Sequence, residues 1–557
     1  MPFDTRQPLS IQATRTINVG RGSGNGGGVL PAPAGTWQYP ANEGWYETGS
    51  REMYLVGPHP DPVTDPTSDV DPNAGHLWAS PDFPYEQDLF VIFGSPPWYF
   101  ELLEGPTGMV IGEFMQVENG ILKYHTDYGK VIWPNPTDVG QPADGWLVRV
   151  RVRDQDFNRG HSELIAEWRV KVDAGKFLII ANGGDNSNPG TWAQPKADFD
   201  GWYLGDETST QFEGMHVVFR DGSYVPRGDF ENANGNIALW RNGGRHPKTF
   251  IVPRGETALF DCREANWIFW GGQDDISFKG HFVFDDSKVQ NPDETLIANC
   301  RNISFLGSAN SDRVYFSGID VDNLKIGSSG TDNPAFVWRP DSFPDRGSDW
   351  AIKSAKFGIS EARSFTQLSG LLPSCVDNIA AIGVVFDGWQ GEKSLQCKSA
   401  VTNYCYYFID MWNIGENSHW GIGTFNGTGY DPLAGTGGGD YLYCKGRNDS
   451  NGVNNAIMSA YWQTNEPATL RTMTLKRNTL RGYSRVGSPE TYPIVVDKSI
   501  VFGGTGNEAV FATGDNIRGS SLSGIDQYID LTTGEVTDPT LIGKYGATLI
   551  DPATVQE

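Results

Sequence analysis

The chain has 557 residues and a formal net charge of −25, from 43 basic and 68 acidic side chains. This acidity excludes the basic footprint of a nucleic-acid-binding protein and disfavours docking on anionic membranes. Gly accounts for 68 of the 557 residues, about 12%, whereas ~7% is usual. Periodicity of the helical type is nearly absent. The 18 Trp residues exclude a disordered acidic chain, so the composition predicts a large, turn-rich, all-β protein.

The first residues, Met1-Pro-Phe-Asp, lack the basic and apolar regions of a signal peptide. No run approaches the ~18 apolar residues of a membrane span, so we expect no membrane insertion. The cysteines form no CxxC motif, and we expect reduced core thiols in a chain made in the cytosol, with one or two disulfides as the alternative. They are Cys262, Cys300, Cys375, Cys397, Cys405 and Cys444.

Residues 1–81 have the composition of an extended Gly/Pro-rich arm and linker. The tract Gly22-Ser-Gly-Asn-Gly-Gly27 fits GxGxxG, but it follows no buried strand and opens no helix, which excludes a dinucleotide site. The acidic run that starts at Asp69 lacks the glycine and the final glutamate of a calcium-binding EF-hand loop.

Residues 82–175 alternate apolar and polar side chains with period two, which predicts a β-sandwich of antiparallel strands with one wet face. The clearest strand is Trp146-Leu-Val-Arg-Val-Arg-Val-Arg153, with valines on one face and arginines on the other. Asp154 and Asp156 follow it; they are weak candidates for a calcium site, and two exposed turn carboxylates are the alternative interpretation. No other metal or cofactor is expected.

Three sequence features in this segment resemble the cadherin-like or Ig-like module of extracellular and phage proteins. They are Gly105-Pro-Thr-Gly-Met-Val-Ile111, Trp133-Pro134 and Val152-Arg-Asp-Gln-Asp156. The resemblance implies a spacer or binding domain.

Residues 176–520 are built from repeats in which a polar turn residue, a short β-branched or aromatic strand and a glycine follow one another. Asp275-Ile-Ser-Phe-Lys-Gly280 recurs further along the chain as Asn302-Ile-Ser-Phe-Leu-Gly307, at an interval typical of one coil. Such a unit buries its apolar face only by stacking on its neighbours, which predicts a solenoid of parallel β-helix coils. The tail, residues 521–557, is expected to cap the last coil.

The segment Gly184-Asp-Asn-Ser-Asn-Pro-Gly-Thr191, with Val217-Val-Phe-Arg-Asp-Gly-Ser-Tyr224 after it, resembles the entry of right-handed parallel β-helix proteins. The expected fold is therefore a right-handed parallel β-helix, preceded by an Ig-like β-sandwich and the Gly/Pro-rich N-terminal arm.

The candidate catalytic residues are Asp387 and Asp410, whose interval in the sequence is the same as that between Trp389 and Trp412. If this interval makes one coil, the two carboxylates stack about 4.8 Å apart beside two indoles. Like charges so close raise one pKa, as a general acid requires, and about 5 Å is the separation of a retaining glycosidase. Trp389, Trp412 and Trp420 would bind sugar rings; the alternative is an aromatic and acidic ladder that follows simply from repetition.

Further candidates lie near this pair. Glu392, Glu416 and His419 are second choices for acid or base. A lyase would need a Tyr, His or Lys base and a cation or metal to neutralise a uronate carboxylate. Tyr404, Tyr406, Tyr407, Lys398 and His419 are available for that chemistry, but no spacing isolates a pair.

The order of arm, cadherin-like module and β-helix resembles a bacteriophage tailspike or tail-fibre protein. That resemblance implies a homotrimer on the virion exterior, made in the host cytoplasm and attached to other tail proteins through the arm. It also implies binding, and often cleavage, of bacterial surface or exo-polysaccharide; the Asp pair favours hydrolysis over elimination. Two alternatives stay open: a non-enzymatic virion fibre that adheres to glycans, and an extracellular bacterial β-helix polysaccharide lyase.

Overall fold

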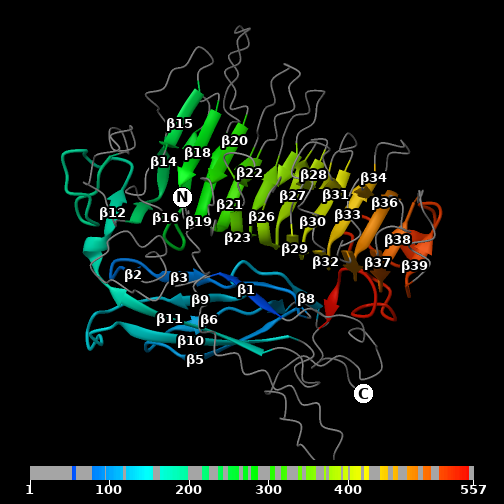
Figure 1. Ribbon diagram of the computed structural model, residues 1–557, viewed down its shortest axis with the longest axis horizontal. Coiled ribbons are helices and arrows are strands. Elements are labelled where there is room, and N and C mark those ends of the chain that lie inside the picture. The colour runs from blue at the N-terminus through cyan, green and yellow to red at the C-terminus, as the bar shows by residue number, and fades with distance from the viewer. Residues whose placement is uncertain are drawn as a thin grey trace, which may run out of the picture.

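The computed structural model of the protein describes residues 53–57, 78–94, 96–116, 121–154, 163–197, 216–224, 236–241, 249–261, 267–273, 277–285, 302–307, 315–322, 336–340, 347–358, 369–371, 376–389, 393–398, 402–414, 420–425, 439–448, 456–461, 473–486, 494–503 and 514–550. These segments are β-structure apart from turns and the short 3-10 helices η3 (Ala174–Lys176) and η4 (Ile525–Gln527). A parallel β-helix lies alongside an antiparallel β-sandwich, which confirms the predicted all-β class (Figure 1).

Two sheets form the body of the sandwich, with strand orders β2-β11-β10-β5 and β3-β9-β6, and their neighbouring strands are antiparallel except for β2, which is parallel to β11. The predicted alternation in β10 is confirmed: its three valines are fully buried, and its three arginines form ion pairs with glutamates. The strands are β2 (Trp78–Ala79), β3 (Tyr85–Asp88), β5 (Tyr99–Glu104), β6 (Val110–Ile111), β9 (Lys130–Trp133), β10 (Trp146–Arg153) and β11 (Glu163–Val172).

Strands from outside residues 82–175 join this unit. β1 (Tyr54–Gly57) pairs with β4 (Phe90–Ile92), and β2 pairs with the end of β11, so segments that the sequence places in the arm and linker contribute strands. The far end of the chain contributes as well: β40 (Leu549–Ile550) pairs with β8 (Ile121–Lys123), which also pairs with β7 (Met115–Gln116).

The β-helix has three parallel sheets, here called the first, second and third sheet in the order in which each coil enters them. The first contains β12 (Phe177–Ile180), β13 (His216–Phe219), β16 (Thr249–Ile251), the starts of β19 (Ser277–Asp285) and β21 (Tyr315–Asp322), β23 (Gly347–Lys353), β26 (Val376–Ile382), β29 (Thr402–Tyr407), β32 (Gly439–Leu442), β35 (Met473–Lys476) and β37 (Ile494–Asp497). The second contains β14 (Gly222–Tyr224), β17 (Ala258–Asp261), the ends of β19 and β21, β24 (Lys356–Gly358), β27 (Val385–Trp389), β30 (Asp410–Ile414), β33 (Lys445–Asn448), the start of β36 (Thr479–Val486), β38 (Ile500–Phe502) and β39 (Ile517–Gly519). The third contains β15 (Asn236–Arg241), β18 (Trp267–Gln273), β20 (Asn302–Gly307), β22 (Phe336–Pro340), β25 (Ser369–Leu371), β28 (Lys393–Lys398), β31 (Trp420–Phe425), β34 (Ala456–Tyr461) and the end of β36.

Coil length varies along the β-helix. Leu178 pairs with Val217 in the first coil and Ile500 pairs with Ile517 in the last, so the first coil is more than twice as long as the last. The predicted equivalence of residues 275–280 and 302–307 is wrong, because β19 lies in the first and second sheets and β20 in the third. The same sequence motif, a polar residue followed by a short strand and a glycine, occurs more than once in a coil. A match between two copies of the motif therefore does not show that their strands stack on each other.

The turn from the first to the second sheet uses one residue with positive φ in each of several successive coils. Glycine serves at Gly280, Gly318 and Gly383, but Phe408 and Tyr443 adopt φ of 58° and 57°. A bulky side chain in this region costs about 1–3 kcal/mol, so surrounding contacts must hold it there. The rings of Phe408 and Tyr443 stack with centroids 5.5 Å apart, and Phe408 also packs on Phe114 of the sandwich.

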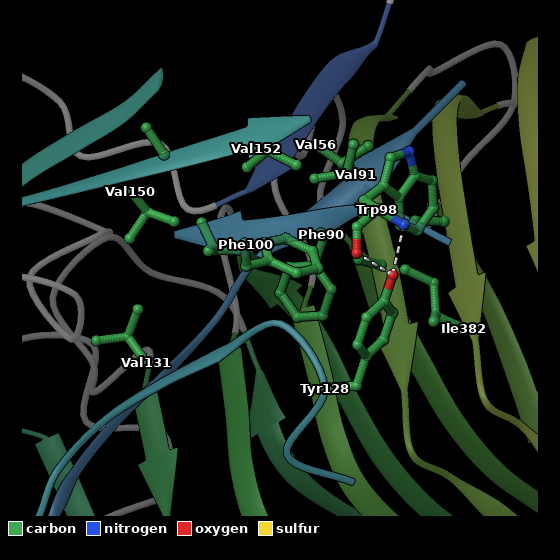
Figure 2. Close-up of a cluster of buried hydrophobic side chains, with 14 of the residues drawn as sticks. Val56, Phe90, Val91, Trp98, Phe100, Tyr128, Val131, Val150, Val152 and Ile382 are labelled. Atoms are coloured by element: carbon green, nitrogen blue, oxygen red, sulfur yellow. Dashed lines mark hydrogen bonds between the residues drawn. The ribbon is translucent and has the colours of Figure 1, made fainter. Parts of the chain in front are cut away.

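The sandwich covers the outer face of the first sheet. Outward side chains of that sheet, including Ala380, Ile382 and Tyr407, are at most 1% exposed and share one core cluster with the sandwich. Figure 2 shows Ile382 of β26 beside Trp98 and Tyr128. The Tyr407 hydroxyl accepts a hydrogen bond from the backbone N–H of Phe93 at 3.1 Å. The first sheet therefore has no free outer face in this region.

A buried ionic network completes this contact between sandwich and β-helix. Asp88 of β3 is 5% exposed, and its carboxylate lies 2.8 Å from Lys353 Nζ of the β-helix and 3.7 Å from Lys130 Nζ of the sandwich. The Ser317 hydroxyl donates to the same carboxylate at 2.5 Å. Although burial alone would raise it, the pKa of Asp88 is lowered by the two lysines. The charge is held by partners from both units.

His216 in β13 gives the fold a dependence on pH. It is 3% exposed, and neither ring nitrogen has a hydrogen-bond partner. Burial, and then the charges of Lys279 and Lys176, lower its pKa to about 3. Between about pH 6.5 and pH 3 the unfolded chain binds a proton here that the folded chain does not, so the free energy of unfolding falls as the pH falls.

We therefore expect His216→Gln to make the acid loss of stability shallower, by up to about 1.4 kcal/mol per pH unit in that window. Urea unfolding at several pH values measures the free energy of unfolding as a function of pH. His125→Gln on the sandwich surface is the matched control. Parallel pH profiles for the wild type and His216→Gln would contradict this account.

The C-terminal segment does more than cap the last coil. Residues 525–536 pack on the outer face of the second sheet, with Ile525, Ile529 and Val536 buried against Trp412 and Ile500. The chain then passes the turn at Arg477, whose guanidinium donates to the Gly543 carbonyl, and ends in β40 on the sandwich. We call residues 525–550 the C-terminal strap, because this segment crosses successive coils and joins them to the sandwich.

Candidate functional site

The predicted carboxylate pair does not form in the register that the equal sequence intervals implied. β27 and β30 are neighbours in the second sheet, but Asp410 is opposite Val385, and Asp387 is opposite Asn413. The pairing shifts twice along these strands, so one strand bulges relative to the other. The predicted stacking of Asp387 on Asp410 is therefore wrong. The predicted stacking of Trp389 on Trp412 is wrong as well, because Trp389 pairs with Ile414.

Each carboxylate has its own cation instead. Asp387 accepts a hydrogen bond from Asn413 Nδ2 at 2.6 Å and lies 3.1 Å from Lys356 Nζ. Asp410 lies 2.7 Å from Lys445 Nζ and accepts from the backbone N–H of Trp412 at 3.0 Å. The hydrogen bond from Asn413, and then Lys356, lower the pKa of Asp387. This direction is opposite to the one that a general acid at this position requires.

Trp412 is not a free platform for sugar rings. It is 3% exposed, and its indole Nε1–H donates to the Leu531 carbonyl of the C-terminal strap at 3.0 Å. Gly534 lies so close that a Cβ there would be 2.5 Å from the indole ring. The prediction that Trp412 stacks on substrate is wrong, because the strap covers it.

The other candidates are only partly described. Trp389 and Trp420 lie in β27 and β31, and their side chains are outside the described residues, as are Glu392, Glu416 and His419. Their roles stay predictions. Of the residues considered for a lyase, Tyr404, Tyr406 and Tyr407 are fully buried, so they cannot meet a polymer from solution.

The candidate calcium ligands are Asp154 and Asp156. Asp154 follows β10 and is 1% exposed, so the alternative of an exposed turn carboxylate is wrong for it. Asp156 is outside the described residues, and the calcium site stays a prediction. Among the residues that the structure describes, no group of three or more His, Cys, Asp or Glu side chains could hold a metal ion. Cys405 and Cys444 are buried thiols that form no disulfide, as predicted. No described helix is long and apolar enough to cross a membrane.

The structure brings together a constellation that the sequence did not reveal. Lys356, Asp387 and Asn413 come from β24, β27 and β30, three neighbouring strands of the second sheet. The side chains of Lys356 and Asp387 are 42% and 43% exposed, and Asn413 is exposed. An ammonium, a carboxylate and an amide on a rigid sheet offer both donors and acceptors to hydroxyl groups.

On the same outer face, toward the C-terminal coils, lie Lys445, Arg447 and Arg481. Arg447 of β33 is directly opposite Arg481 of β36. Lys445 Nζ and Arg447 Nη1 donate to the strap carbonyls of Thr533 and Leu531, at 3.0 and 3.4 Å. We call the outer side chains from β24 to β36 the charged strip: Lys356, Asp387, Asp410, Asn413, Lys445, Arg447 and Arg481.

Comparisons with known proteins add little to this picture. No family model and no curated protein matches the chain. Among solved structures, the chain is similar to pectate lyase Pel9A, with 12% sequence identity, a TM-score of 0.29, and coverage of 62% of this chain and 77% of that one. A likeness of this size carries no argument about activity.

Proposed function

We propose that this protein is a bacteriophage tailspike-like receptor-binding protein that binds bacterial surface or exo-polysaccharide on the charged strip. The observation that carries the proposal is the exposed group of Lys356, Asp387 and Asn413, held on a rigid parallel sheet. The outer face of the first sheet lies under the sandwich. The outer face of the second sheet is open to solvent at Lys356 and Asp387. A homotrimer, a place on the virion exterior and attachment through the N-terminal arm belong to the same proposal.

The site supports binding better than it supports hydrolysis. A retaining or inverting glycosidase needs two carboxylic groups that face one substrate, one of them protonated. Asp387 and Asp410 each form an ion pair with a separate lysine, and the pKa of Asp387 is lowered. The function proposed is therefore binding. Cleavage of the polysaccharide, by hydrolysis or by elimination, is a second activity that the assay below would detect.

The test is binding of polysaccharides isolated from bacterial surfaces to the full-length protein, by isothermal titration calorimetry. We expect Asp387→Asn and Lys356→Met each to weaken binding about 5–10-fold, because each removes a charge-assisted hydrogen bond. Asp144→Asn is the matched control, since Asp144 is an exposed aspartate in an ion pair with Arg169 on the sandwich. Unchanged affinity in both strip variants would contradict the proposed site.

The same samples show whether the protein also cleaves. New reducing ends without ultraviolet absorbance of an unsaturated sugar mean hydrolysis, and both signals together mean elimination. Neither signal, with binding retained, identifies an adhesive fibre protein.

A further inference from the structure

A small cleft lies between the sandwich and the first coils of the β-helix, on a different sheet from the charged strip. Its walls are largely apolar and come from both units, and they include Trp78, Phe83, Tyr85, Phe177 and Ile251. We call it the junction cleft. The space inside takes only about one or two molecules of the size of water. The junction cleft is therefore too small for a sugar ring but large enough for a molecule of about three heavy atoms.

Lys279 of β19 lines the junction cleft. It is 9% exposed, and its Nζ donates a hydrogen bond to the side-chain oxygen of Gln87 at 2.8 Å. Burial lowers the pKa of Lys279 to about 7, although the carboxylates of Asp88 and Glu86 act to raise it. About half of this amine is therefore neutral at pH 7, and a neutral amine has the lone pair of a nucleophile.

Two further polar side chains lie close to Lys279 under the sandwich. Ser277 stands two positions before Lys279 in β19, so both side chains point to the same face of the sheet. His216 packs on Phe177 of the cleft wall with ring centroids 5.4 Å apart, and the charge of Lys279 adds to burial in lowering its pKa. Ser277 and His216 are 5% and 3% exposed, and neither the hydroxyl nor the two ring nitrogens have a hydrogen-bond partner among the described residues. Buried donors without partners are costly, so an oxygen acceptor placed here would stabilise the fold.

The size of the cleft and the chemistry of Lys279 favour carbon dioxide among small electrophiles. Carbon dioxide has three heavy atoms and no charge, so it can enter an apolar cleft with little loss of hydration. The lone pair of Nζ bonds to its carbon, one carbon–oxygen double bond gives its electron pair to the oxygen, and the amine releases one proton to solvent. The product is a carbamate, whose two oxygens are hydrogen-bond acceptors. An aldehyde would leave an imine, which has no such oxygen.

The charges around the junction cleft accommodate an anion on Lys279. The nearby carboxylates of Asp88 and Glu86 both lie within ion-pair distance of Lys130. Glu86 also pairs with Arg254, which lines the cleft. These carboxylates are therefore offset by cations of their own. Lys130 repels the ammonium form of Lys279 but attracts an anion in its place.

We propose that Lys279 binds carbon dioxide reversibly as a carbamate, with Ser277 and His216 as donors to the carbamate oxygens. The reaction changes the charge of a buried side chain at the contact between sandwich and β-helix. It does not depend on the proposed glycan binding, which takes place on another sheet. A lysine of ordinary pKa is almost wholly protonated near neutral pH, so the unfolded chain reacts much less, and carbon dioxide stabilises the folded state.

Carbamate trapping tests the site directly. The full-length protein is equilibrated with carbon-13 bicarbonate at about pH 7.5 and then alkylated with triethyloxonium tetrafluoroborate, which makes a carbamate permanent. Peptide mass spectrometry locates the label. We expect Lys279 to carry it at least about tenfold more often than Lys544, an exposed lysine of the C-terminal strap, because only about 0.1% of an ordinary lysine is neutral at this pH.

Two variants test the amine and its donors. Lys279→Met keeps a long apolar side chain and should lose the label at this position. Ser277→Ala keeps the amine and should reduce the label on Lys279 about fivefold, since one hydrogen bond to the carbamate is lost. Ser223→Ala, at an exposed serine in β14, is the matched control and should be labelled like the wild type. Far-ultraviolet circular dichroism checks that each variant is folded.

The unfolding midpoint gives a second, independent measurement. Carbon dioxide should raise the urea midpoint of the wild type and leave that of Lys279→Met unchanged. Equal labelling of Lys279 and Lys544, or no label on Lys279, would overturn the proposal. A label on Lys279 that Ser277→Ala does not reduce would overturn the role of Ser277 as donor. A failure of glycan binding would leave this inference standing, since the two sites share no residue.

Discussion

Replacing Asp88 by Asn is expected to destabilise the folded protein by about 3–5 kcal/mol, because the change leaves the buried Lys353 without its carboxylate and Lys130 with Glu86 in place of two carboxylates. Lys353 is 1% exposed, so it cannot turn to solvent without opening the contact between sandwich and β-helix. The midpoint of urea unfolding, followed by tryptophan fluorescence and by circular dichroism, measures the loss.

The matched control for Asp88 is an ion pair on the outer face of the sandwich. Glu101 lies 3.1 Å from Arg151, and both side chains are partly exposed. Glu101→Gln should therefore change the stability by no more than about 1 kcal/mol. If Asp88→Asn and Glu101→Gln shift the unfolding midpoint equally, the buried network does not hold the two units together.

The second large effect is expected at Trp412. Trp412→Ala should destabilise the protein by about 3–5 kcal/mol, since it opens a cavity under the C-terminal strap and removes the hydrogen bond to Leu531. Polysaccharide binding, measured at a temperature where the variant is folded, should change much less than the stability. For a residue that stacks on a sugar, the substitution would weaken polysaccharide binding strongly and change the stability little.

Trp412→Phe separates packing from hydrogen bonding. It keeps most of the ring contact with Gly534 and loses the indole N–H, so we expect a smaller loss, on the order of 1–2 kcal/mol. Loss of glycan binding in Trp412→Phe with unchanged stability would restore the interpretation of Trp412 as a platform and contradict the buried position.

The class of fold was predictable from sequence because both of its signals are local. Alternation of apolar and charged side chains in Trp146–Arg153 depends on a single strand, and β10 has the predicted pattern of burial. The repeats between Gly280 and Gly383 depend on short strands ended by a turn, and both glycines indeed have positive φ. The contact between sandwich and first sheet was not predictable, since it depends on side chains far apart in the sequence, such as Phe93 and Tyr407.

The site was predicted less well, for a related physical reason. The interval between Asp387 and Asp410 identifies stacked positions only if the coils have equal length and the strands have no bulge, and neither condition holds here. Lys356 and Asn413 carry no motif, and their closeness to Asp387 follows from strand register alone. Trp412 was expected one coil from Trp389, and β30 does neighbour β27, but the strap that covers Trp412 comes from much further along the chain.

The pairing of β40 with β8 sets an order of events during synthesis. The ribosome makes β8 early and β40 only after the whole β-helix. Until then one edge of the small sheet formed with β7 lacks its neighbour, so its backbone groups are available to other chains. Any product that stops before residue 549 keeps this edge open however well its coils have formed. Premature termination and proteolytic trimming at the C-terminus should therefore yield chains that associate with one another, whereas completed chains close the edge by themselves.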